Sequence, residues 1–283
     1  MNRRSFVTSI PTGMALAGSS LSSSALAAPR KGRLKQSVTG GVFGRTQMSF
    51  EDRAKKAAEM GVVGYDLVTP DQFPILKKYG LVPAMVRGGG TLTDNMNHKE
   101  NHAKLEPEYR AALKAASEAG APNVIALSGN RRGINDQEGL DNCVALLTKL
   151  KGQAEDQNVT ICMELLNSKV NHPDYQCDRT SWGVELCKRV GSPRVKLLYD
   201  IYHMQIMEGD VIRTIRANFQ YLGHFHTAGN PGRHEMDDTQ EMNYRGIAKA
   251  IADLNYTGYV AHEYSPLGDA MTSLENTLKM FEV

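Results

Sequence analysis

TICMELLNSKVNHPDYQCDRTSWGVELCKRVGSPRVKLLYD, residues 160–200, contains two short apolar runs on either side of an amphipathic segment. The runs 160–165 and 195–200 have the length and composition of buried strands, whereas 182–190 has the apolar spacing of a helix. A strand, a helix and a second strand in this order are typical of a parallel βαβ unit. This segment therefore predicts one unit of an α/β fold with a parallel sheet.

The same alternation of short apolar runs and amphipathic segments continues through the rest of the chain. The predicted strands are 35–38, 64–68, 81–86, 123–127, 160–165, 195–200, 221–226 and 258–262. The predicted helices are 50–60, 71–79, 107–119, 137–156, 182–190, 211–218, 244–254 and 271–281. Eight strand–helix pairs in about 250 residues predict a single (β/α)8 TIM barrel domain over 35–283, in preference to a doubly wound sheet. The glycines at 88–90 lack the Gly-x-Gly-x-x-Gly spacing of a dinucleotide site.

The first 27 residues have the features of an export signal. Arg3 and Arg4 precede a weakly apolar stretch that ends in small residues at 25–27. The Arg-Arg-x-Phe pattern resembles a twin-arginine signal, which predicts an exported, periplasmic protein. We expect a cleaved signal over 1–27, a linker over 28–34 and no membrane attachment after cleavage.

The charge balance bears on the class of partner. The chain has 33 basic and 31 acidic residues, which become equal in number when Arg3 and Arg4 are set aside. Such a balance gives no general attraction to a phosphate backbone, so we expect a small-molecule substrate and no nucleic acid. The sequence leaves the oligomeric state, including a homo-oligomer, open.

Four cysteines, at 143, 162, 177 and 187, contain no Cys-x-x-Cys pair, which excludes a zinc ribbon. In an oxidising compartment the four cysteines could form two disulfides. Because Cys143 and Cys187 lie in predicted helices and Cys162 in a predicted strand, buried free thiols are the favoured interpretation.

Four consecutive predicted strands end in side chains that can bind a metal ion: Glu164, Asp200, His226 and Glu263. The carboxyl ends of barrel strands form the mouth in which active sites lie. A carboxylate after an apolar strand is costly to bury unless it is paired or bound to a metal. Three carboxylates and one imidazole favour Mn²⁺ or Mg²⁺ over Zn²⁺. The alternative is four solvated strand ends.

The polar residues at the predicted mouth indicate a chemistry. Two glutamates facing each other, Glu164 and Glu263, suit proton transfer at a carbon next to a carbonyl, with a cation stabilising the enediolate. His203, Arg233 and Asn167 follow the same strands and are candidates for contact with the substrate. Arginines after the third and fourth strands could bind a substrate carboxylate or simply lie on the surface: Arg87, Arg131 and Arg132.

Several short motifs carry a resemblance to a known family. They are Asp-x-Tyr-His-Met-Gln at 200–205, Pro-Gly-Arg-His-Glu at 231–235, Asn-Tyr at 243–244, and Gly-Tyr at 258–259 leading to Glu263. With them the chain resembles the hydroxypyruvate isomerase family, within the xylose isomerase-like barrels that also include ketose 3-epimerases.

The resemblance implies a catalytic pair, Glu164 and Glu263. It implies a divalent ion bound by Glu164, Asp200, His226 and Glu263, and substrate oxygens held by His203 and Arg233. The chain has Val170 where some epimerases carry a further acid, and the long loop 168–178 predicts room for more than a three-carbon acid.

The leading interpretation is a metal-assisted isomerase acting on hydroxypyruvate or a related keto sugar. A ketose 3-epimerase and a lyase on an oxidised sugar begin with the same proton abstraction, so both stay open. A multi-zinc endonuclease of the same architecture needs a histidine-rich cluster and a basic groove, and the chain offers neither. A non-catalytic periplasmic sugar-binding protein is the remaining alternative.

Overall fold

The computed structural model describes Met1 and residues 28–44 and 46–283. The predicted export signal falls almost wholly outside the described residues, so the signal and the periplasmic location stay predictions. Residues 28–34, predicted as a linker, lie against the barrel. Arg30 donates a hydrogen bond to the carbonyl of Met60 at 2.8 Å and forms ion pairs with Glu275 and Glu282 near the end of the chain.

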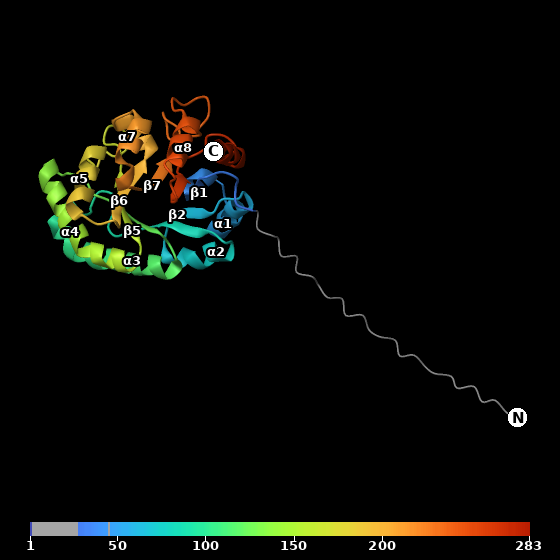
Figure 1. The fold of residues 1–283 in the computed structure, drawn as a ribbon, viewed down its shortest axis with the longest axis horizontal. Helices are drawn as coiled ribbons and strands as arrows, with labels where there is room; N and C mark the ends of the chain where they lie inside the picture. Colours follow the sequence, from blue (N-terminus) through green and yellow to red (C-terminus); the bar gives the residue numbers. More distant parts are fainter. Residues whose placement is uncertain (2–27, 45) are drawn as a thin grey trace.

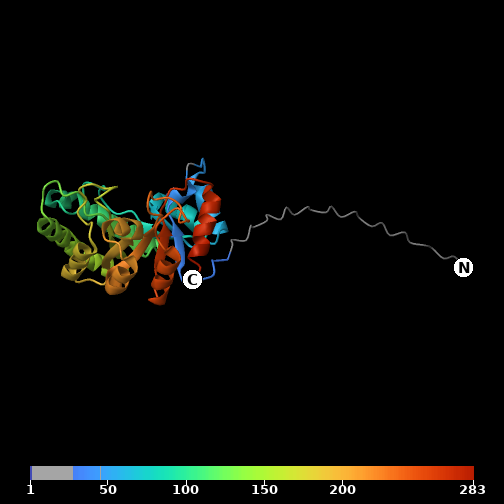
Figure 2. The same cartoon turned by 90° about the horizontal axis from the view of Figure 1, so that it is seen from above.

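Eight parallel strands close into a barrel in the order of the sequence. Figures 1 and 2 give two views of this fold, turned by 90° from each other. The strands are β1 (Lys35–Val38), β2 (Gly64–Val68), β3 (Val82–Val86), β4 (Asn123–Ala126), β5 (Thr160–Leu165), β6 (Val195–Asp200), β7 (Leu222–Thr227) and β8 (Tyr259–His262). Pairing of β1 with β8, in which Lys35 lies opposite Tyr259, closes the ring. The (β/α)8 prediction is confirmed.

The helices surround the strands (Figure 1). They are α1 (Phe50–Glu59), α2 (Phe73–Lys78), α3 (His102–Ala119), α4 (Asp136–Asp156), α5 (Thr180–Val190), α6 (Ile201–Met207), α7 (Val211–Asn218), α8 (Tyr244–Asp253) and α9 (Ala270–Met280). Short 3₁₀ turns are η1 (Gly40–Phe43), η2 (Pro70–Gln72), η3 (Lys99–Asn101) and η4 (Phe219–Tyr221). Within the described part of the chain, no helix has both the length and the apolar character needed to cross a membrane.

Two helices differ from the prediction. The helix predicted over 107–119 begins at His102, because Leu105 is buried and holds the additional turn against the core. Helix α6 was not predicted. It forms directly after β6 because the side chain of Asp200 accepts a hydrogen bond from the backbone N–H of His203 at 3.0 Å, which caps the helix.

The barrel interior positions the functional side chains. Successive strand residues point alternately into the barrel and toward the helices. Four buried side chains form a small apolar cluster apart from the main core: Met85, Ile125, Cys162 and Leu198. Glu164 and Asp200 come two residues after Cys162 and Leu198 on the same strands. They therefore point into the same interior, nearer its carboxyl end.

The cysteines are buried and unbonded, which confirms the prediction of free thiols at 143, 162, 177 and 187. Burial raises the pKa of Cys187 to about 12. A thiol with such a pKa stays protonated at neutral pH and is a poor nucleophile.

The three glycines after β3 serve close packing. A Cβ atom on Gly88 would lie 2.2 Å from the carbonyl oxygen of Ile125 and 2.4 Å from Cε1 of Tyr109. Tyr109 is fully buried on α3, so it has little freedom to move. Gly88 lets the loop pass between β4 and α3 at a separation that no other residue permits.

We predict that Gly88→Ala lowers the free energy of unfolding by about 2–3 kcal/mol, since the added methyl overlaps backbone and a packed ring. The matched control is Gly152→Ala on the exposed face of α4, where a Cβ would meet nothing within 4 Å. This change should raise the free energy of unfolding by about 0.5–1 kcal/mol. Urea unfolding of both variants tests the prediction, and equal stability of Gly88→Ala and the wild type would contradict it.

Candidate active site

Four side chains from consecutive strands converge at the carboxyl end of the barrel. Glu164 lies on β5, Asp200 ends β6, His226 lies on β7 and Glu263 directly follows β8. The strand register places Asp200 beside His226, and His226 beside the residue two positions before Glu263. One potential ligand atom from each residue lies within 4.8 Å of the others. The structure thus brings together the set that the sequence predicted.

The two glutamates of this cluster have different electrostatic environments. Nδ1 of His226 lies 2.8 Å from Oε2 of Glu263 and 3.4 Å from Oε1 of Glu164. Burial disfavours ionisation of Glu263, yet His226 and Arg233 lower its pKa to about 2. Burial dominates at Glu164 and raises its pKa. Carboxyl groups whose pKa values are pushed apart can serve as the base and the acid of one reaction.

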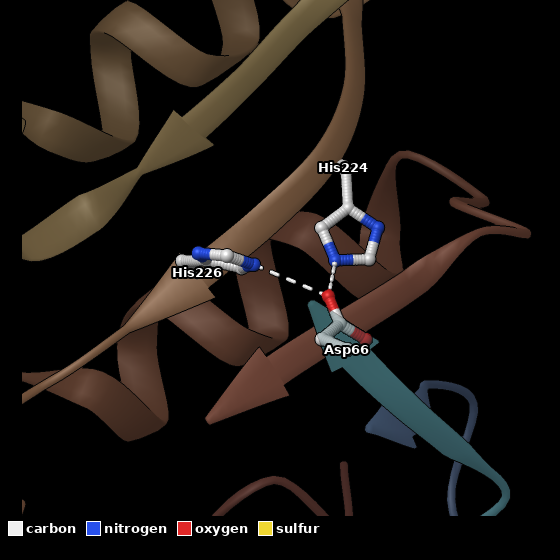
Figure 3. Close-up of side chains that lie close together, drawn as sticks. All are labelled: Asp66, His224 and His226. Atoms are coloured by element: carbon white, nitrogen blue, oxygen red, sulfur yellow. Dashed lines mark hydrogen bonds and ion pairs between the residues drawn. The ribbon is translucent and has the colours of Figure 1, made fainter. Parts of the chain in front are cut away.

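The carboxylate of Asp66, on β2, contacts the ring nitrogen of His226 that faces away from Glu263. Nε2 of His226 lies 3.2 Å from Oδ2 of Asp66 on β2, and Nε2 of His224 lies 2.6 Å from the same oxygen. Figure 3 shows both imidazoles directed at this carboxylate. The hydroxyl of Ser37 donates to its other oxygen. Although burial opposes ionisation, the two imidazoles lower the pKa of Asp66, which is therefore a carboxylate.

Sequence reasoning missed Asp66. The residue lies inside the predicted strand 64–68 and not at its end, so the search of strand ends did not include it. Its contact with β7 exists only because the barrel closes and β2 then lies across the interior from β7. An acidic residue in the middle of an otherwise apolar strand was the one available signal.

The donor set at the mouth fits a divalent cation. Among the described residues, the buried Nδ1 of His226 has no partner in hydrogen-bond geometry and contacts only the oxygens of Glu263 and Glu164, at 2.8 and 3.4 Å. The bond from its other ring nitrogen to Asp66 is the arrangement that orients metal-binding histidines. Carboxylate oxygens from Glu164, Asp200 and Glu263 add the hard ligands that Mg²⁺ and Mn²⁺ prefer. Asp66, His224 and His226 form a second close group, but its atoms already bond to one another.

The predicted substrate-contacting residues lie around this cluster in different ways. Nη2 of Arg233 lies 2.9 Å from Oε2 of Glu263 and 3.8 Å from Oδ2 of Asp200. Nε2 of His203 lies 3.7 Å from Oδ2 of Asp200 and, in the described part of the chain, has no hydrogen-bond partner. Burial, reinforced by Arg233, lowers the pKa of His203, so the ring is neutral.

Asn167 reaches the site through His203. It is fully buried, and its amide Nδ2 donates to Nδ1 of the His203 ring. Its Oδ1 accepts hydrogen bonds from the backbone N–H groups of Val170 and Asn171. The bond at Nδ1 leaves the proton of the neutral ring on Nε2, where it faces Asp200. A direct contact between Asn167 and the substrate stays a prediction.

Two sequence motifs form the support of the loop that carries Arg233. The hydroxyl of Tyr244 donates to the carbonyl of Ala228 at 2.6 Å, just after β7. Oε1 of Glu235 accepts hydrogen bonds from the N–H groups of Leu267 and Gly268, which follow β8. These contacts tie the loop after β7 to the loop after β8, so the guanidinium of Arg233 is held beside Glu263.

The arginines after the third and fourth strands differ in their contacts. Arg131 forms ion pairs with Asp136 and Asp178, each at 3.1 Å, and Arg132 pairs with Asp94 at 3.1 Å. Arg87 instead lines a cavity of about 400 Å³ that Arg233 and Glu263 also line. Of the three, only Arg87 therefore borders the space next to the catalytic candidates.

Known proteins resemble the chain in sequence. It is 37% identical over 113 residues to a 2-oxo-tetronate isomerase of Cupriavidus necator, an alignment that covers 40% of this chain and 43% of the relative. A 2-oxo-tetronate isomerase of Pectobacterium atrosepticum is 27% identical over 240 residues, covering 79% of this chain and 89% of the relative. A hydroxypyruvate isomerase of Escherichia coli is 38% identical over 105 residues, covering 36% and 40%. The chain spans less than half the length of several of the curated relatives that it matches.

Solved structures with the same fold are more distant in sequence. An AP endonuclease of family 2 from Brucella melitensis superposes with a TM-score of 0.75 at 23% identity, over 85% of this chain and 97% of the other. A D-psicose 3-epimerase gives a TM-score of 0.73 at 18% identity, over 88% and 100%. At these identities the similarity shows the fold alone. A family model, described as the xylose isomerase-like TIM barrel, matches residues 75–281, and the chain belongs to that family.

Proposed function

We propose that the protein is a metal-dependent isomerase, similar to hydroxypyruvate isomerase, that moves a proton from a hydroxyl-bearing carbon to the neighbouring carbonyl carbon. The observation that carries this proposal is the placement of two glutamates, with pKa values pushed apart, around a donor set that fits a divalent cation. The names of the relatives, hydroxypyruvate isomerase and 2-oxo-tetronate isomerase, support a small keto acid as substrate.

The residues divide the reaction between them. Glu263, whose pKa is low, is ionised and accepts the proton from the hydroxyl-bearing carbon. Glu164, whose pKa burial raises, returns a proton to the former carbonyl carbon. The proton of the substrate hydroxyl passes to the former carbonyl oxygen, and proton exchange with solvent then restores the ionised Glu263 and the protonated Glu164. The N–H groups of Arg233 and His203 donate to the substrate oxygens on which negative charge develops. A divalent cation held by Glu164, Asp200, His226 and Glu263 would supply further positive charge for those oxygens.

We expect the wild-type protein, supplied with Mn²⁺ or Mg²⁺ in D₂O, to place deuterium on carbon next to the carbonyl of hydroxypyruvate or a four-carbon keto acid. Glu263→Gln should slow this exchange by about 10²–10⁴-fold because it removes the base, and Glu164→Gln should slow formation of the deuterated isomer by a similar factor because it removes the acid. Proton NMR follows the exchange directly.

The control for these variants is Glu185→Gln, which changes an exposed glutamate on α5. It should exchange deuterium at the wild-type rate. Exchange that survives both a chelator and the two glutamate substitutions would refute the proposed mechanism.

We predict that Asp66→Asn weakens Mn²⁺ binding by about 10–100-fold, because an amide holds the His226 imidazole less firmly than a carboxylate does. Calorimetry on the metal-free protein measures the dissociation constant without any substrate. Asp253→Asn, at an exposed position on α8, is the matched control and should bind Mn²⁺ like the wild type. If Asp66→Asn binds Mn²⁺ with unchanged affinity and keeps its fold by circular dichroism, Asp66 does not contribute to metal binding and the prediction is wrong.

A further inference from the structure

The cavity beside Glu263 continues over the ends of β1 and β2 to helix α1. Its volume is about 400 Å³, and its lining away from Glu263 includes Gly40, Arg53, Tyr65 and Arg87. The carboxylates that line it are Asp66 and Glu263, and both already contact cationic groups of the active site. The end of the cavity at α1 and β3 therefore carries two guanidinium groups and no lining carboxylate of its own.

Arg53 and Tyr65 offer polar atoms that the protein itself does not use. Nε of Arg53 and the hydroxyl of Tyr65 are buried and lack a hydrogen-bond partner in the described part of the chain. No described carboxylate lies within the 4.0 Å ion-pair distance of Arg53, whereas Arg131 and Arg233 are both paired. Because buried polar groups in folded proteins are nearly always bonded to protein, water or a ligand, two unused donors in one cavity offer hydrogen bonds to whatever occupies it.

The two groups face the same small space. A Cβ atom on Gly40 would lie 3.5 Å from Nη1 of Arg53 and 3.7 Å from the hydroxyl of Tyr65. The glycine thus leaves open the volume next to the Arg53 guanidinium and the Tyr65 hydroxyl. Burial raises the pKa of Tyr65, so its hydroxyl keeps its proton and can donate it in a hydrogen bond.

At the edge of the cavity, an irregular backbone conformation at Leu67 places its carbonyl oxygen where it binds Arg87. Leu67 has a φ of 59°, a left-handed conformation that branched side chains rarely adopt, and the pairing of β2 with β3 shifts register around it. Its carbonyl oxygen accepts a hydrogen bond from Nε of Arg87 at 2.9 Å. Strain of this kind is concentrated at functional sites in proteins.

We propose that this cavity is an anion subsite in which Arg53 and the hydroxyl of Tyr65 bind the carboxylate of the substrate, with Arg87 at the rim. The inference rests on the proposed function, in which the substrate is a small keto acid, and assigns the residues that hold its carboxylate. A guanidinium presents parallel N–H groups that match the two oxygens of a carboxylate. The Tyr65 hydroxyl adds a neutral donor beside it.

Binding of ligands that cannot be isomerised tests the subsite apart from turnover. Threonate is a four-carbon sugar acid without a keto group, and erythritol is an uncharged alcohol of the same length. By calorimetry on the metal-loaded protein, we expect threonate to bind more tightly than erythritol. Arg53→Gln should raise the dissociation constant of threonate by about 10–100-fold, since a charge-assisted hydrogen bond is lost. It should leave that of erythritol unchanged, and Arg53→Lys should restore part of the threonate affinity.

Two further variants sharpen the test. Arg213→Gln removes an arginine that is 85% exposed on α7 and should bind threonate like the wild type. Gly40→Ala fills the space next to both groups without changing any charge, and should weaken threonate binding while leaving the melting temperature unchanged.

Three results would overturn the proposal. The first is an equal loss of threonate and erythritol binding in Arg53→Gln, and the second is unchanged threonate binding in Arg53→Gln or Gly40→Ala. The third is Arg53-dependent binding of erythritol 4-phosphate that is tighter than that of threonate, which would assign the subsite to a phosphate ester. Absence of deuterium exchange on every keto acid would refute the proposed isomerase activity alone, because the selectivity for threonate is measured without turnover.

Discussion

The imidazole of His226 lies between carboxylates that come from three different strands. Its Nε2 contacts Asp66 on β2, and its Nδ1 lies near Glu164 on β5 and Glu263 after β8. Buried carboxylates are costly unless they are paired, so this one ring stabilises much of the charge at the barrel mouth. Arg233 pairs with Glu263 from the rim. A shift of β2 relative to β7 would break these contacts, and so closure of the barrel and the electrostatics of the site depend on the same side chain.

The part of the site that lies on strand ends was predictable. Glu164, Asp200 and His226 each follow an apolar run that predicts a strand. Because side chains alternate between the two faces of a strand, the run also predicts whether each of these side chains points into the barrel. Once eight strand–helix pairs indicate a closed barrel, the carboxyl ends of neighbouring strands must meet. The sequence pattern did not predict α6. This helix is capped by the side chain of Asp200, which the pattern had assigned only to the end of a strand and to a metal site.

Contacts between distant parts of the chain could not be predicted. Asp66 and His226 are 160 residues apart, and no periodicity links them. Arg53 belongs to the amphipathic pattern of α1, where an arginine is expected at the solvent-facing side. Packing of α1 against β2, as in the contact of Phe50 with Tyr65, brings the arginine's guanidinium and the Tyr65 hydroxyl to the same glycine, Gly40. Asn167, in turn, was correctly placed near the mouth, yet its hydrogen bonds to the loop backbone depend on a turn that the sequence pattern does not reveal.

The proposed reaction and the proposed recognition use different halves of the barrel. The proton-transfer groups and the metal ligands come from β5 to β8, whereas the groups assigned to the carboxylate come from α1, β2 and the segment after β3. Substitutions in the first half of the chain can therefore change which substrate binds while the reacting groups stay in place, in keeping with the many activities that one barrel supports. Strand β2 connects the halves, because Tyr65 points toward α1 and its neighbour Asp66 points into the barrel to hold His226. In this proposal, an anion that contacts Tyr65 binds next to Asp66, the residue that orients the candidate metal ligand His226.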